Sequence, residues 1–101
     1  MYLMKELTSQ QRSHLTKEAH HLKPVVMLGQ KGASESLIKM VDESLEIHEL
    51  IKIKFLDHKG DRRAITEKIC DECKASLVRI VGNIAIIYRQ ATKPEDRQYR
   101  V

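Results

Sequence analysis

Helix-like and strand-like segments alternate along this chain, and their order restricts the fold more than any other feature. Apolar residues recur at helical spacing in three segments and form short strand-like runs in four, in the order α-β-α-β-α-β-β. Strands joined through helices pair in parallel, whereas the short link Gly82-Asn83 makes the last two strands an antiparallel hairpin. The sequence therefore predicts an α/β fold, a two-layer sandwich with a four-stranded mixed sheet and three helices.

Breaking and capping residues set the ends of these segments. Pro24 ends the first helix, over residues 10–22, because a residue that precedes proline is pushed out of the helical region. The apolar runs predict strands at residues 25–28, 50–56, 77–81 and 84–89. A capping residue is expected before each helix: Thr8 or Ser9, then Ala33 or Ser34, then Asp61.

Periodicity also predicts which side chains are buried. In the strand over residues 50–56, three apolar side chains alternate with Lys52 and Lys54, so one face is buried and the other is basic and solvated. The apolar faces of the second and third helices are expected to contain Leu37, Ile38, Val41, Leu45 and Ile47, and Ile65, Ile69 and Cys73.

Length and charge narrow the class of protein. A chain of 101 residues forms one domain, expected over residues 1–92, and residues 93–101 lack apolar periodicity and are expected to fray. The 18 Lys and Arg against 14 Asp and Glu give a net charge of +4, which favours an anionic partner such as nucleic acid. The N-terminal residues show neither a signal peptide nor a membrane span, so we expect a cytoplasmic protein with reduced cysteines and no membrane partner.

The loop Gly29-Gln30-Lys31-Gly32 contains two of the four glycines in the chain. It links the first predicted strand to the second predicted helix, whose first amides are unpaired and carry a partial positive charge. Glycines permit close approach of another backbone, and Lys31 adds a charge, so a phosphate fits there. KH domains clamp a nucleic-acid backbone with such a G-x-x-G loop. The plain alternative is a turn that needs glycine for its geometry alone.

Several separated motifs resemble the CRM domain family (chloroplast RNA splicing and ribosome maturation), especially its stand-alone bacterial members of YhbY type. They are LT..QR...L...AH.LKPVV.LG..G, then HELIKIK, then VG.....YR, and together they run from about Leu7 to Arg89. The resemblance implies a fold like the C-terminal domain of bacterial translation initiation factor three. It also implies RNA binding and association with precursors of the large ribosomal subunit. The family often has a basic residue directly after the first glycine of the loop, where this chain has Gln30.

These observations give a set of candidate RNA-binding residues. The expected partner is RNA, large-subunit ribosomal RNA or its precursor particle, bound by a monomer that assists ribosome assembly. Arg79 either joins Lys52 and Lys54 or faces the other way, and Arg89 either binds phosphate or caps the sheet edge. The candidates are Gly29, Gln30, Lys31, Gly32, Lys23, Arg12, Lys52, Lys54, Arg79 and Arg89.

Two other classes of function remain as alternatives. A protein-interaction module that docks on a ribosomal protein or assembly factor would show an exposed apolar patch and RNA affinity that ignores salt. An enzyme is not expected: His48-Glu49 lacks the second histidine of a zinc protease motif, because Lys52 stands there. Cys70 and Cys73 have no second pair of ligands, so no metal site and no cofactor are predicted.

Overall fold

Each helix begins where the sequence predicts a capping residue. The structure, a computed structural model, describes residues 6–99. Helix α1 (Ser9–Ala19) begins with a capping box, in which Thr8 and Gln11 each accept a hydrogen bond from the other's backbone amide. Helix α2 (Glu35–His48) is capped by the Ser34 hydroxyl. Helix α3 (Arg62–Cys73) follows a 3₁₀ turn, η1 (Lys59–Asp61), and Asp61 stands at its N-cap position without a side-chain capping bond.

The four strands form one mixed sheet, as predicted. They are β1 (Val26–Leu28), β2 (Leu50–Phe55), β3 (Ser76–Val81) and β4 (Ile84–Tyr88). Their order is β1-β2-β4-β3, with β1 parallel to β2 and both other pairs antiparallel. The expected parallel pairing of β2 with β3, which are joined through α3, is wrong, because β4 lies between them. Gly82 turns the β3–β4 hairpin with a φ of 57°. The α/β class and the three helices are confirmed.

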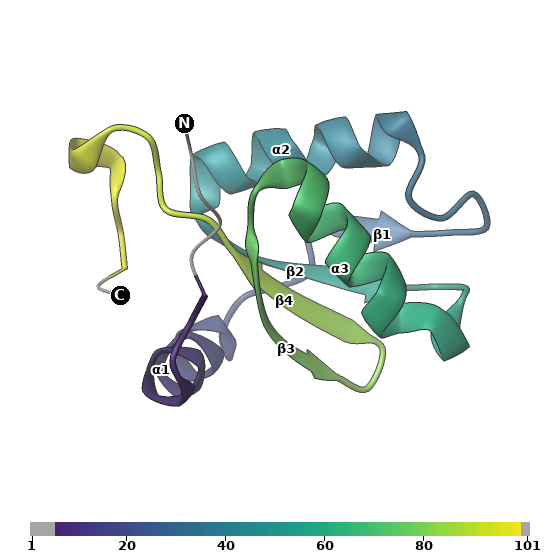
Figure 1. The fold of residues 1–101 in the computed structure, drawn as a ribbon, viewed down its shortest axis with the longest axis horizontal. Helices are drawn as coiled ribbons and strands as arrows, with labels where there is room; N and C mark the ends of the chain where they lie inside the picture. The colour runs from purple at the N-terminus through teal and green to yellow at the C-terminus, as the bar shows by residue number, and fades with distance from the viewer. Residues whose placement is uncertain (1–5, 100–101) are drawn as a thin grey trace.

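Helices lie on both faces of this sheet (Figure 1). The larger apolar cluster joins α2 and α3 to one face, through side chains such as Leu45, Ile69 and Phe55. The smaller cluster joins α1 to the opposite face, through Leu15 and Tyr88 among others. The predicted two-layer sandwich describes the sheet with α2 and α3, and α1 adds a partial cover on the other side.

Most predicted core residues are buried, with one clear exception. Ile51, Ile53 and Phe55 are each at most 1% exposed, as their alternation requires. Ile47, which was assigned to the apolar face of α2, is 67% exposed, so this assignment was wrong. Ile47 lies two residues after Leu45, and at about 100° per residue that step turns its side chain away from the face that packs on the sheet.

The C-terminal segment crosses back over the domain after β4. It contains a 3₁₀ turn, η2 (Pro94–Asp96), and the amide of Gln98 donates a hydrogen bond to the carboxylate of Glu49. The ring of Tyr99 meets that of Tyr88 edge-on, with centroids 6.4 Å apart. The segment expected to fray therefore has defined contacts through residue 99. The boundary at residue 92 and the fraying of 93–101 stay predictions about motion, and residues 100–101 lie outside the described range.

Candidate nucleic-acid interface

The loop Gly29–Gly32, which we call the GQKG loop, is a tight turn between β1 and α2. The amide of Gly32 donates to the carbonyl of Gly29 at 3.0 Å, and the amide of Ser34 donates to the carbonyl of Gly32 at 3.0 Å. Gly32 has a φ of 65°, a conformation that side-chain-bearing residues rarely adopt. Gly29 has no such φ, and a Cβ placed on it would meet no atom within 4 Å. Turn geometry therefore accounts for Gly32 and leaves Gly29 without a conformational reason.

Three loops lie at this end of the sheet (Figure 1). The second is the loop after β2, and the ring Nε2 of His58 lies 2.7 Å from the carbonyl oxygen of Gln30. The carbonyl can only accept, so Nε2 carries the hydrogen in this contact. The third is the β3–β4 hairpin, whose Asn83 carbonyl accepts from the amide of Phe55 at 2.7 Å. The GQKG loop is thus braced from the side rather than projecting freely.

The strand register places a row of exposed and half-buried side chains directly beside these loops. Met27 pairs with Lys54, Lys54 with Ile84, and Ile84 with Val81, so the four residues form a line across all four strands. Met27 is 50% exposed and Val81 53% exposed, and Lys54 is exposed between them. These side chains lie on the face that α1 covers only in part. We call this line the open row.

The next row along the same face contains Lys52, Ile86 and Arg79. Arg79 therefore joins the face of Lys52 and Lys54, which settles the orientation that the sequence left open. The reason is a β-bulge between Leu77 and Arg79, which breaks the alternation of side chains along β3. Val78 packs against α1, and Arg79 follows it on the same side and is exposed to solvent.

Lys52 is less exposed to solvent than the alternation in the sequence predicts. Its side chain is half-buried, and Nζ donates a hydrogen bond to the carbonyl of Leu22 at 2.9 Å. This bond ties β2 to the segment that leaves α1. Lys23 directly follows Leu22 and is exposed. The structure thus brings Lys23 and Lys52 to the same side of the sheet, while Lys54 alone of the two strand lysines is exposed.

Arg12 lies at the far edge of the sheet from the GQKG loop. It lines a shallow hollow of about 240 Å³ beside the edge strand β3, together with Arg63, Arg79 and three β3 neighbours, Leu77, Val78 and Ile80. We call this site the arginine hollow. Sequence reasoning missed Arg63. The only signal was the pair Arg62-Arg63, because no linear spacing connects residues of α1, β3 and α3.

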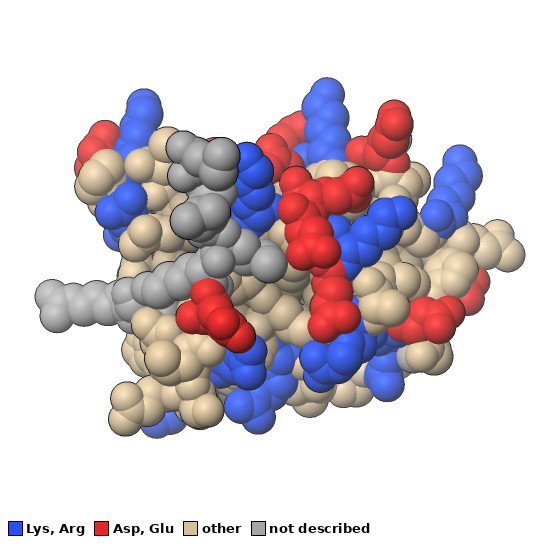
Figure 2. All heavy atoms as spheres, in the orientation of Figure 1, with Lys and Arg blue, Asp and Glu red and all other residues tan. Residues whose placement is uncertain are grey.

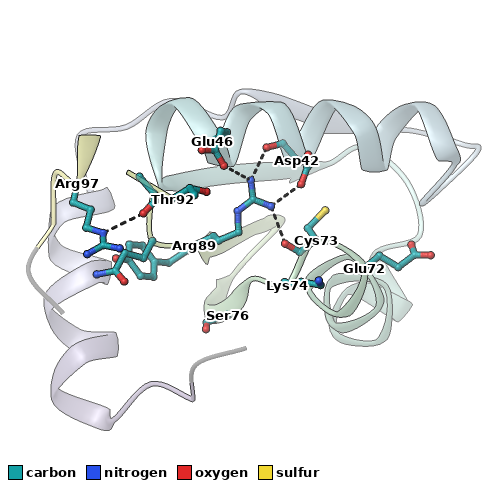
Figure 3. A pocket seen from close by; sticks show the side chains of 12 residues that line it. Asp42, Glu46, Glu72, Cys73, Lys74, Ser76, Arg89, Thr92 and Arg97 are labelled. Atoms are coloured by element: carbon teal, nitrogen blue, oxygen red, sulfur yellow. Dashed lines mark hydrogen bonds and ion pairs between the residues drawn. The ribbon is translucent and has the colours of Figure 1, made fainter. Parts of the chain in front are cut away.

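Arg89 does not face the GQKG loop. Its guanidinium, 12% exposed, donates to the carboxylates of Asp42 at 2.6 Å and Glu46 at 3.2 Å (Figure 3). It also donates to the backbone carbonyl of Cys73 at 2.8 Å, so one side chain joins β4 to α2 and α3. These contacts line a hollow of about 720 Å³ that has acidic as well as basic walls. β4 is an interior strand, so Arg89 does not cap the sheet edge, and its bonds to α2 and α3 favour the role of a structural clamp over that of a phosphate ligand.

The two cysteines lie in the apolar core, and both are free thiols. Burial raises the pKa of Cys70 to about 12 and that of Cys73 to about 11. Such thiols are poor nucleophiles and poor metal ligands near neutral pH. Among residues 6–99, no three His, Cys, Asp or Glu side chains gather in a way that would hold a metal ion.

Charge is unevenly distributed over the surface. Figure 2 shows acidic side chains gathered in a strip over α3, with basic side chains on both sides of it. The strands contrast with this helix, because none of the four contains an Asp or Glu. Over the described part of the chain, no helix is long and apolar enough to cross a membrane.

Comparison with known proteins shows which family shares this sequence and fold. The family model described as the CRS1 / YhbY (CRM) domain matches residues 7–89. The Probable RNA-binding protein PA4753 of Pseudomonas aeruginosa is 36% identical over 87% of this chain and 86% of its own length. The Probable RNA-binding protein YqeI of Bacillus subtilis is 33% identical, over 84% of this chain and 90% of its own. The solution structure of SAV1595 from Staphylococcus aureus matches with a TM-score of 0.78 at 29% identity, covering 93% of this chain and 99% of that one. The chain belongs to the CRS1/YhbY (CRM) domain family.

Proposed function

We propose that the protein binds RNA through the loop end of the sheet and that its target is ribosomal RNA or a precursor of the large subunit. The relatives that carry RNA-binding names support the class of ligand. The environment of Gly29 is the observation that supports this site. This position has open space around its Cα and no conformational need for glycine, so the missing side chain leaves room for an approaching RNA backbone.

The proposed contacts are electrostatic and geometric. Lys31 is exposed on the GQKG loop, four residues before the first residue of α2, where the helix dipole is positive. Lys54 stands on the adjacent open row. Glu35, in the first turn of α2, adds a negative charge that limits the affinity of this end for phosphate. The geometry therefore favours contacts to the RNA backbone, which position an RNA without reading its sequence.

In this proposal the protein acts as a monomer in the cytoplasm, assists ribosome assembly, and requires no cofactor and no catalysis. Lys31, Gln30 and the two loop glycines hold the phosphate. Lys54 and Arg79 add positive charge along the sheet, and Lys23 and Arg12 extend it toward α1. Lys52 contributes through its charge while its Nζ remains bonded to Leu22.

Equilibrium binding to purified large-subunit ribosomal RNA over a salt series tests this function. The logarithm of the affinity should fall with the logarithm of salt, by roughly 0.7 per phosphate contact for a single-stranded site. Gly29→Asp should abolish binding, and Lys31→Ala should reduce both affinity and slope. Lys93→Ala is the matched control, because Lys93 is an exposed lysine in the segment after β4, which lies at the other end of the domain from the loop (Figure 1). Affinity that ignores salt and both loop variants would contradict the proposal.

A protein partner is the second candidate, and one observation favours it. Met27 and Val81 are large apolar side chains at least half exposed on the same sheet face. Exposed apolar groups that share a face are typical of contact surfaces. Docking on a ribosomal protein or assembly factor would use this face without depending on Lys31.

A further inference from the structure

The open row and the arginine hollow have properties that the proposed contact at the GQKG loop does not use. The open row places Met27, Ile84 and Val81 around Lys54. Base planes pack against apolar side chains as well as aromatic ones, and methionine adapts its shape to such contacts. A duplex hides its bases, so this mixture of apolar and basic groups suits unpaired nucleotides.

The arginine hollow lies at the other end of this row. Arg12, Arg63 and Arg79 come from α1, α3 and β3 and converge on one cavity. Over residues 6–99, none of the three forms an ion pair with an acidic side chain. Arg12 and Arg63 also line a neighbouring hollow with the acidic residues Glu6, Glu67 and Asp71, but without an ion pair to them. The guanidinium groups can therefore reach a phosphate, which they bind in a bidentate manner, or a base plane.

The row and the hollow are connected by the sheet itself. Val81 and Arg79 both belong to β3, the strand that lines the hollow. The GQKG loop follows β1, three strand spacings away, which is about 14 Å at about 4.8 Å per spacing. No strand places an acidic residue along this path. A chain of alternating phosphates and bases complements it in both charge and polarity.

We infer that a single-stranded RNA segment crosses the sheet along the open row, with one phosphate at the GQKG loop and another in the arginine hollow. This inference rests on the proposed function and adds the state of the RNA, its path and the role of Arg63. Phosphates contact Lys31 at one end and Arg63 at the other. Bases lie on Met27 and Val81 between them.

Fluorescence anisotropy with an oligouridine of roughly 12 nucleotides tests the inference, with a duplex of the same length as comparison. Wild-type protein should prefer the single strand. Met27→Ser and Val81→Ser should each weaken binding by about fivefold without changing the salt slope, because they remove a base contact and no charge. Arg63→Ala should weaken binding and lower the slope by about 0.7. Ile47→Ser, which replaces an even more exposed apolar side chain on α2, should leave RNA affinity unchanged.

The outcomes separate this inference from the proposed function. Loss of binding in Gly29→Asp, with Met27→Ser, Val81→Ser and Arg63→Ala all like wild type, would overturn the path and leave the loop contact standing. A preference for the duplex would also overturn it. If wild-type protein binds neither oligouridine nor ribosomal RNA, the proposed function itself fails, and the open row becomes a protein-docking surface. Should Val81→Ser unfold the hairpin, Met27→Ser, on the opposite edge of the sheet, still decides the result.

Discussion

The guanidinium of Arg89 lies 2.6 Å from the carboxylate of Asp42 and clamps the end of β4 to the middle of α2. The same group bonds the Cys73 carbonyl at the end of α3. Replacing Arg89 with Met should lower the free energy of unfolding by about 2–3 kcal/mol, because a half-buried charged hydrogen-bond network loses its donor. RNA affinity of the folded variant should stay within about twofold of wild type.

Arg79→Met is the matched comparison for this clamp. Arg79 is exposed and has no ion pair over the described residues, so stability should hardly change while RNA binding weakens. Urea unfolding and RNA titration of both variants check the contrast. If Arg89→Met retained full stability and lost RNA affinity instead, Arg89 would be a phosphate ligand after all.

Substitutions at the two glycines of the GQKG loop should have different effects, one on stability and the other on RNA affinity. Gly32→Ala forces a side chain into the left-handed region and should cost about 1–2 kcal/mol of stability. Gly29→Ala should leave stability within about 0.5 kcal/mol, because its surroundings are empty, and should reduce RNA affinity. Thermal melts and RNA titrations of the two variants measure the difference. Equal RNA affinity for Gly29→Ala and wild type would remove the main support for the loop contact.

Glu49 should act as the anchor of the C-terminal segment. Its carboxylate is 1% exposed and accepts hydrogen bonds from the amides of Ala91, at 2.6 Å, and Gln98. Glu49→Gln places an amide group against one of these donors and should cost about 1.5–3 kcal/mol. The amide of Gln98 should then exchange with solvent much faster in hydrogen-exchange measurements. Glu43→Gln, an exposed control on α2, should leave that exchange unchanged. Rapid exchange at Gln98 already in wild type would instead support the frayed tail expected from the sequence.

The buried thiols predict a loss of stability in alkali. The pKa of Cys70 is raised to about 12 and that of Cys73 to about 11, mainly by burial, from an ordinary value of 9.0. The unfolded chain therefore releases these protons first, so stability falls as pH rises from about 9 toward 11 or 12. Urea midpoints at about pH 8 and about pH 10 should show a smaller decline in a Cys70→Ala/Cys73→Ala variant than in wild type. An identical decline in both proteins would contradict this account.

Local sequence patterns predicted the helices and strands well. Features that depend on tertiary contacts could not be predicted from such patterns. Thr8 and Ser34 act as caps because capping depends only on residues within one turn. The orientation of Arg79 depends on a bulge, which alternation in the sequence does not reveal. The role of Arg89 depends on Asp42, which lies 47 residues earlier. The likeness to the CRM family, rather than periodicity, indicated RNA as the ligand, and Arg63 emerged only when three elements were seen to converge.

A map of amide chemical-shift changes during titration with a ribosomal RNA fragment would locate the bound RNA on the surface. If the loop end of the sheet binds RNA, the largest changes should occur in the GQKG loop, at the start of α2, in the loop after β2 and along the open row. The amides of the acidic residues of α3, which are Glu67, Asp71 and Glu72, should remain unperturbed. Changes confined to α3 or to the Arg89 hollow, with the GQKG loop unaffected, would contradict the claim that this end of the sheet binds RNA.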